Sequence, residues 1–170
     1  MKLKVLFYIL ILVCFTNCNL SSPVGFWKKF EYQNRVEFIN QNGWFGGIHV
    51  LHWVGINGKY NKNEIIKLAK DNGWILKKEQ TFSSEQTHKW LYNDKAIFPI
   101  SWGKFNPEIE TPFSGFENFP RWIEGKITVL SFETDLISID PSTQKNHLIN
   151  GFILLSEERN EMTLYYEWGE

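Results

Sequence analysis

The feature that most constrains the fold of this chain is an alternation of apolar and polar residues with a period of two. It is clearest over residues 162–168, which read Met-Thr-Leu-Tyr-Tyr-Glu-Trp. Because successive side chains of a β-strand point to opposite faces, this alternation is typical of a strand with one buried face. We therefore expect the even-numbered residues of this segment to face a core, and Thr163, Tyr165 and Glu167 to face outward.

Further segments rich in β-branched and aromatic residues predict more strands. Turn residues such as Asn57-Gly58 and Asn93-Asp94 separate them and favour hairpins over long crossovers. We expect an α+β fold dominated by antiparallel strands, about seven to nine in number, that form a curved sheet or a barrel. The other strand-like segments are 26–38, 48–56, 74–82, 88–92, 96–102, 127–139 and 149–156.

One main helix is predicted over residues 62–72. Asn61 is a suitable N-cap, and Glu64 lies three residues further on, which is the spacing of a capping box. Asn72-Gly73 ends the apolar stripe, because glycine adopts the left-handed conformation after a helix at little cost. A helix of this length is marginal by itself, so we expect it to pack on the sheet.

The start of the chain is typical of an export signal. Two lysines among the first four residues precede an uncharged apolar run over residues 5–15. This run is shorter than an ordinary membrane span and has the length of the apolar region of a signal peptide. Phe15-Thr16-Asn17-Cys18 follows it and resembles the lipobox of bacterial lipoproteins.

The lipobox resemblance implies an organisation for the whole chain. In that family the cysteine is lipidated and becomes the new N-terminus, so residues 1–17 would be a signal peptide and Cys18 would carry the lipid. Residues 18–25 would then be the lipidated N-terminus and a spacer, followed by a single β-rich domain over 26–170. We expect this domain in the bacterial cell envelope, tethered to a membrane and facing the periplasm or the surface. Secretion after cleavage behind Thr16, or an uncleaved anchor, are the alternatives.

Cysteine usage and charge exclude several classes of site. Cys14 and Cys18 are the only cysteines, so a folded part that starts after Cys18 holds no disulfide, thiolate ligand or cysteine nucleophile. Lysine and arginine total 18 against 19 acidic residues, a balance that argues against a nucleic-acid partner. The sequence contains no glycine-rich phosphate loop, and we expect no cofactor.

Gly25-Phe26-Trp27 opens the first predicted strand and resembles the Gly-x-Trp motif with which lipocalin-like barrels begin. In that family the tryptophan closes one end of a barrel that holds an apolar ligand. The resemblance implies a lipocalin-like barrel with Trp27 at its closed end. A core tryptophan on an edge strand is the alternative.

Aromatic residues are unusually frequent, with 14 Phe, 8 Trp and 6 Tyr. Most are expected in the core, since strands favour such rings. Rings in loops are better candidates for ligand contact, because loops face solvent and aromatic faces bury sugars or apolar groups. The proline-rich segment 106–124 is predicted to be a long loop outside the sheet. The predicted ligand-contacting residues are Trp44, Phe113, Phe116, Phe119 and Trp122.

Candidate catalytic groups are few. His49 and His52 lie three apart on a predicted strand and so point to opposite faces, which argues against a shared metal ion. Ser101-Trp102-Gly103-Lys104 matches the Ser-x-x-Lys of penicillin-recognising enzymes, but that family's Ser-Asp-Asn and Lys-Thr-Gly partners are absent from the sequence. Two carboxylates that face a sugar would suit a glycosidase. The loop carboxylates available for this are Glu108, Glu110, Glu117 and Glu124.

Two main hypotheses of function follow. The first is a lipid-tethered envelope module that binds a glycan, an apolar small molecule or a protein partner without chemistry. The second is a small hydrolase that acts on a glycan through the loop carboxylates. A protein that inhibits an enzyme, or gives immunity against one, is a third alternative.

Overall fold

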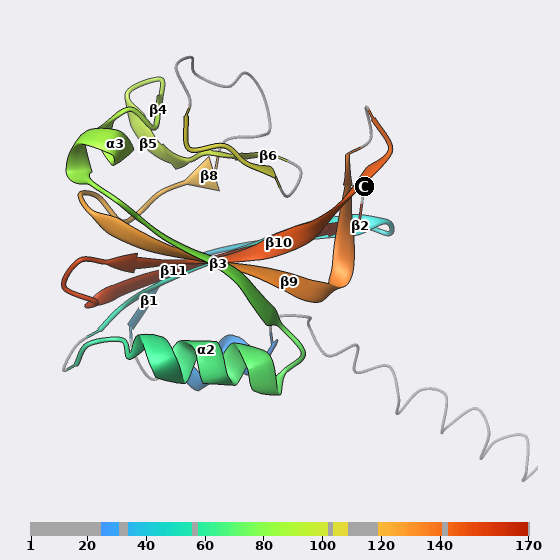
Figure 1. Ribbon diagram of the computed structural model, residues 1–170, viewed down its shortest axis with the longest axis horizontal. Coiled ribbons are helices and arrows are strands. Elements are labelled where there is room, and N and C mark those ends of the chain that lie inside the picture. Colours follow the sequence, from blue (N-terminus) through green and yellow to red (C-terminus); the bar gives the residue numbers. More distant parts are fainter. Residues whose placement is uncertain are drawn as a thin grey trace, which may run out of the picture.

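A six-stranded antiparallel sheet forms the centre of the protein (Figure 1). The structure is a computed structural model and describes residues 25–30, 34–55, 58–101, 104–108, 119–140 and 143–169. The strands of the sheet are, in spatial order, β1 (Asn34–Asn42), β2 (Gly46–Val54), β11 (Glu161–Gly169), β10 (Lys145–Ser156), β9 (Ile127–Asp140) and β3 (Ile75–Phe82).

The sheet is open, because β1 and β3 lie at its two edges in the part of the chain that the structure describes. The predicted class, an α+β fold dominated by antiparallel strands with one main helix, is confirmed. The curved sheet is the form that the structure shows, and the barrel of the lipocalin resemblance is not formed by these strands. None of the helices in the described ranges is long and apolar enough to cross a membrane.

The first described element differs from the prediction of a strand from Phe26 onward. Gly25–Phe30 form a 3-10 helix, η1, and the strand begins only at Asn34. The side chain of Trp27 is fully buried, with its ring centroid 5.5 Å from that of Trp74. The apolar residues of this segment thus pack against one face of the sheet and do not add a strand to it. Local alternation of apolar and polar residues does not distinguish these two arrangements.

Both faces of the sheet are buried, by two separate layers. Helix α2 (Lys62–Asp71) and η1 cover one face, and a layer of short elements covers the other (Figure 1). Leu164 and Tyr166 pack in the lower core, on the face of the sheet that α2 and η1 cover. Tyr165 packs in the upper core, on the opposite face, under the short elements. The prediction that Thr163, Tyr165 and Glu167 face outward is therefore wrong, since all three are buried. The second layer comes from other parts of the chain, and nothing in the strand itself indicates it.

The second layer contains short strands and a one-turn helix. Its tightest turn is at Asn93 and Asp94, whose φ angles of 49° and 61° fit a two-residue hairpin, as the sequence predicts. Arg121 is buried in this layer, donates to the carbonyl of Thr87 at 2.8 Å and lies 5.7 Å above the ring of Trp90. The elements are α3 (Ser84–His88), β4 (Leu91–Tyr92), β5 (Lys95–Phe98), β6 (Ile100–Ser101), β7 (Lys104–Phe105) and β8 (Phe119–Pro120).

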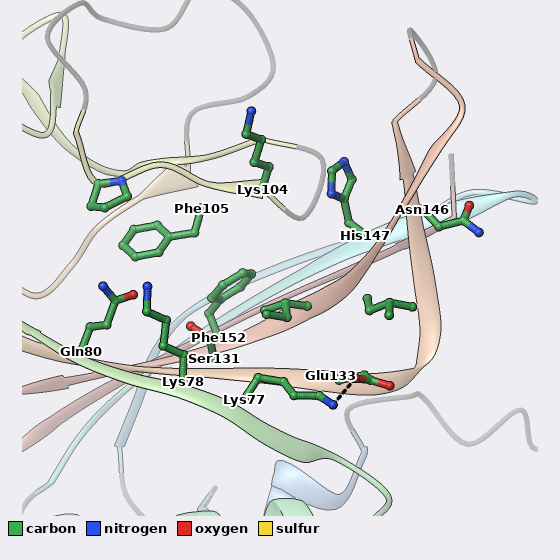
Figure 2. Close-up of a pocket in the computed structure, with 13 residues that line it drawn as sticks. Lys77, Lys78, Gln80, Lys104, Phe105, Ser131, Glu133, Asn146, His147 and Phe152 are labelled. Carbon is green, nitrogen blue, oxygen red and sulfur yellow. Dashed lines mark ion pairs between the residues drawn. The ribbon is translucent and has the colours of Figure 1, made fainter.

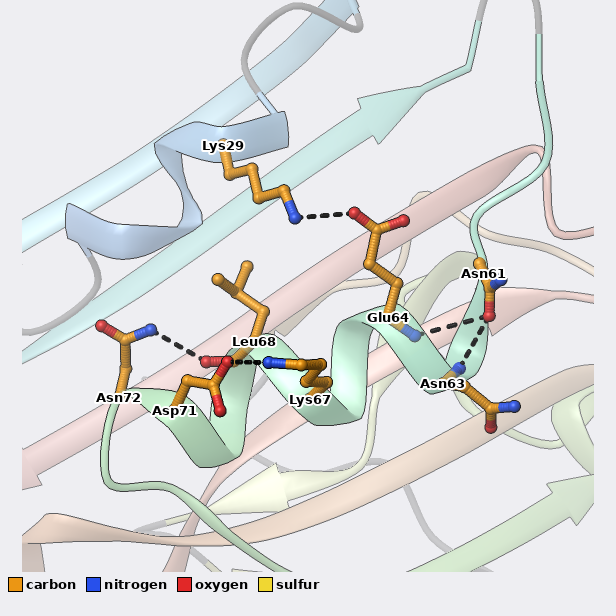
Figure 3. Close-up of polar contacts among 8 residues, drawn as sticks. All are labelled: Lys29, Asn61, Asn63, Glu64, Lys67, Leu68, Asp71 and Asn72. Carbon is orange, nitrogen blue, oxygen red and sulfur yellow. Dashed lines mark hydrogen bonds and ion pairs between the residues drawn. The ribbon is translucent and has the colours of Figure 1, made fainter.

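The predicted helix forms over Lys62–Asp71 and is capped as expected at its start. The side chain of Asn61 accepts hydrogen bonds from the backbone N–H groups of Asn63 and Glu64, at 2.9 and 3.4 Å (Figure 3). The Glu64 carboxylate instead forms an ion pair with Lys29 of η1, with 2.7 Å between Oε1 and Nζ. The expected return bond of a capping box is thus replaced by a link between the two helices of this layer.

We predict that Asn61→Ala lowers the free energy of unfolding by about 1 kcal/mol, because two N-terminal N–H groups of α2 lose their acceptor. Asn63→Ala is the matched control, since this exposed side chain lies in the same helical turn, and it should change stability by less than about 0.5 kcal/mol. Urea unfolding of both variants measures the difference. Equal stability of the two would show that the cap contributes nothing.

Candidate functional site

A cleft of about 610 Å³ lies above the sheet, between the β6–β7 pair and the edge formed by β3, β9 and β10 (Figure 2). Its volume lies within the range of small-molecule sites. We call it the lysine-rimmed cleft. Its lining residues are Lys77, Lys78, Gln80, Lys104, Phe105, Pro107, Ser131, Glu133, Asn146, His147, Leu148, Ile149 and Phe152.

Aromatic and aliphatic side chains form the floor of the cleft. The ring of Phe105 stacks on that of Phe98, with centroids 4.9 Å apart and planes 18° apart, and meets Phe82 edge to face at 5.6 Å. These buried neighbours hold Phe105 in place against the cleft. Phe152 lies beneath it, 6.1 Å away between ring centroids, and Ile149 continues the apolar surface along β10. The apolar surface of the cleft is therefore packed in place by its neighbours.

Three lysines surround this floor. The pairing of β3 with β9 shifts by one residue between Leu76 and Lys78, and this bulge allows the consecutive residues Lys77 and Lys78 both to line the cleft. Lys77 forms an ion pair with Glu133 of β9. Lys78 points from β3 into the cleft, and Lys104 stands at the opposite rim (Figure 2).

A bend in β9 and β10 shapes the far wall of the cleft. The register between them shifts twice, between His147 and Ile149 and between Ile149 and Gly151. Asn150 lies at this bend and is fully buried. Its Nδ2 donates to the backbone carbonyls of Leu136 and Glu167, at 2.7 and 2.8 Å, and its Oδ1 accepts from Thr134 Oγ1 at 2.9 Å.

A buried carboxylate forms a further hydrogen bond next to the bend. Ser138 Oγ donates to Glu167 Oε1 at 2.9 Å, and both side chains are buried. We call the part of β9 and β10 beyond the register shifts the bent β9–β10 arm. Since Ser138 belongs to β9 and Glu167 to β11, this bond joins the bent arm to a central strand of the sheet. The buried carboxylate therefore has a structural role.

The residues predicted to contact a ligand do not gather in the cleft. Trp44 is 99% exposed in the turn between β1 and β2, outside the cleft lining. Phe119 is buried in the upper core, 5.8 Å from the Tyr165 ring, and so has little surface to offer. Trp122 is half-buried and lies 5.5 Å from the His52 ring. Phe113 and Phe116 lie outside the described residues.

His52 forms a buried polar cluster under Trp122. Its Nδ1 lies 2.7 Å from Thr163 Oγ1, and its Nε2 lies 3.7 Å from Glu161 Oε1. Burial lowers the pKa of His52 to about 4. Burial also raises the pKa of Glu161, and the negative charge of Glu124 raises it further. Thr163 is fully buried, so this cluster offers no nucleophile to a substrate.

The other catalytic candidates stay apart. His49 stacks on Trp168 on the lower face, whereas His52 lies under Trp122 on the upper face, as their spacing predicts. Among the residues that the structure describes, no three His, Cys, Asp or Glu side chains group as a metal site. Glu108 and Glu124 are exposed and neither lines the cleft. Glu110 and Glu117 lie outside the described residues.

Sequence reasoning did not identify the lysine-rimmed cleft. One local signal was available in the strand-like segment 74–82. Its even-numbered residues are apolar except Lys78 and Gln80, which indicates a polar site on the otherwise apolar face of that strand. Ser101 ends β6 and pairs with Lys104 of β7, so the serine of the Ser-x-x-Lys pattern lies in a strand and not at a helix start.

Comparison with known proteins adds no relative. No family model, no curated protein and no solved structure matches this chain. What the cleft can bind is therefore argued from its own chemistry.

We predict that acid destabilises the protein partly through His52. The unfolded chain takes up a proton near the ordinary pKa of 6.5, while the folded state resists it down to about 4. Stability is therefore full above pH 6.5 and lost as the pH falls to 4, by at most about 3 kcal/mol. The buried His49, with its lowered pKa, acts in the same direction. The raised pKa of Glu161 acts in the opposite one, since its contribution is lost as pH rises.

Denaturant unfolding between pH 4.5 and 7.5 measures this dependence. His52→Gln should flatten the slope relative to the natural chain, and His88→Gln, at an exposed position, should leave it unchanged. An unaltered slope in His52→Gln would contradict the assignment.

Proposed function

We propose that this protein is a non-catalytic binding module of the bacterial cell envelope, whose cleft holds a small apolar ligand that carries an acidic group. The observation that supports this most is that lysines and apolar side chains line the same cleft, with Lys78 pointing into it. Sites for small molecules are commonly concave and apolar, with a few polar groups that orient the ligand. The cleft fits this description.

Charge selects the polar end of the ligand. Lys77 is paired with Glu133. The other two lysines are Lys78, which points into the cleft, and Lys104, whose ammonium group is directed outward from the rim. Within the described ranges, no acidic side chain forms an ion pair with either of them. A carboxylate, sulfate or phosphate on the ligand would supply the missing charge, because lysine binds such anions as a compact point charge.

The floor selects the rest of the ligand. Phe105 and Ile149, both half-buried, present apolar surface, and Leu148 extends it toward solvent, while the buried Phe152 packs behind them. Burying a hydrocarbon chain on this surface is favourable by roughly 0.8 kcal/mol for each methylene group. A medium-length fatty acid, or an acidic lipid fragment, combines the two features.

A glycan-acting hydrolase is less well supported by this geometry. Such enzymes need two carboxylates on either side of the scissile bond. The described lining of the cleft contains one, Glu133, and that carboxylate is engaged by Lys77. Binding without chemistry is therefore the function that we propose.

We predict that dodecanoate binds and that Lys78→Gln/Lys104→Gln weakens its affinity about tenfold or more, equivalent to about 1.4 kcal/mol. The uncharged dodecanol should bind the natural protein and this variant equally. Octanoate should bind more weakly than dodecanoate, because it buries four fewer methylene groups. Isothermal titration of the full chain measures all three.

Lys70→Gln is the matched control, since Lys70 is exposed on α2 at the other face of the sheet. It should leave every affinity unchanged. The proposed ligand would be refuted if Lys70→Gln lost as much affinity as the variant of the cleft lysines. It would also be refuted if the natural chain bound dodecanoate and dodecanol equally and replacing the cleft lysines had no effect.

A further inference from the structure

The exposed large apolar side chains of the described residues gather at one end of the sheet. Trp44 and Phe45 are the most exposed, at 99% and 82%. We call this region the apolar end. Its members are Trp44, Phe45, Ile75, Leu136, Ile137 and Leu148.

The strand register brings these residues together. Gly46, next to the Trp44–Phe45 turn, pairs with Gly169, and Gly169 pairs in turn with Ser138. Ser138 follows Ile137 in β9 and lies opposite His147, the neighbour of Leu148. In Figure 1 the β1–β2 turn and the bent β9–β10 arm lie at the right-hand end of the molecule, and the start of β3 lies below the sheet, nearer to its middle.

The Trp44–Phe45 turn is closed by a backbone hydrogen bond and flanked by paired strands. The N–H of Gly43 donates to the carbonyl of Gly46 at 2.6 Å, and Asn42 pairs with Gly47 at the base of the turn. The turn joins β1 to β2, which pair with each other, and β2 pairs with β11 on its other side. No charged residue occurs over residues 40–48, so inserting this turn into an apolar medium would not bury a charge.

We propose that the apolar end is a membrane-contact surface, on which Trp44 and Phe45 enter the lipid–water interface and orient the domain. Exposed apolar patches mark interaction sites, and tryptophan is the residue type that favours the boundary between lipid and water. Lipid suits separate rings and aliphatic groups on several projections, because a fluid surface adapts to their spacing.

The start of the described chain lies toward the same end. The ring of Phe26 is 5.5 Å from that of Trp74, the residue before Ile75. Cys18 precedes Gly25 by seven residues, a length of chain that spans at most about 25 Å. A lipid on Cys18, as the sequence predicts, would hold the domain at this distance from a bilayer, and two weak attachments together give stable, oriented binding.

Fluorescence quenching tests the proposal with the full chain. The protein is mixed with phosphatidylcholine vesicles whose acyl chains carry bromine near the headgroup, and with the same vesicles without bromine. We expect brominated vesicles to quench a fraction of the emission comparable to one tryptophan out of eight. Trp44→Leu should lose this quenching, and Trp122→Phe, on the upper face away from the apolar end, should retain it.

Circular dichroism verifies that both variants are folded, which is expected at so exposed a position as Trp44. Adding phosphatidylglycerol should not be needed, because the turn carries no charge. The proposal would be overturned if the natural chain showed no quenching, or if Trp44→Leu were quenched to the same extent as the natural chain. Quenching that occurs only in anionic vesicles would overturn it too. Emission of Trp44 that responds to a soluble glycan but not to vesicles would assign the turn to a glycan instead.

Discussion

The bend in β9 and β10, which forms one wall of the cleft, is held by one buried side chain, Asn150. Its amide satisfies the carbonyls of Leu136 and Glu167 and accepts from Thr134 at the position where β9 and β10 leave their regular register. A buried backbone carbonyl without a partner would cost roughly 1–3 kcal/mol. By satisfying two, Asn150 allows the strands to bend away from the sheet. The bend provides the far wall of the lysine-rimmed cleft and also carries part of the apolar end.

The burial of both sheet faces explains why local sequence patterns predict some elements and not others. Helix α2 and the Asn93-Asp94 turn are specified by nearby residues, through an N-cap and through two left-handed residues. The alternation in β11 correctly places Met162 and Leu164 in the lower core. It does not reveal that Tyr165 is covered too, because the cover comes from residues about 40 to 75 positions earlier in the chain.

The cleft was unpredictable for a related reason. Lys78 and Lys104 lie on β3 and β7, and only the packing of the β6–β7 pair over the sheet edge brings them to one cavity. Of the three predicted ring residues that the structure describes, Trp44, Phe119 and Trp122, Trp44 is the one that is fully exposed. Loop position indicated its exposure, since its turn consists of asparagine, glycine and aromatic residues without a core-facing partner.

A ligand is proposed to bind in the lysine-rimmed cleft, between the β6–β7 pair and the bent β9–β10 arm. Amide chemical shifts of the isotope-labelled protein, followed by NMR during addition of octanoate, test this most directly because they report on every part of the sheet at once. We expect the largest shifts at Lys78, Phe105 and Ile149, which line the cleft. Shifts concentrated around Trp44, or spread evenly over the surface, would contradict it.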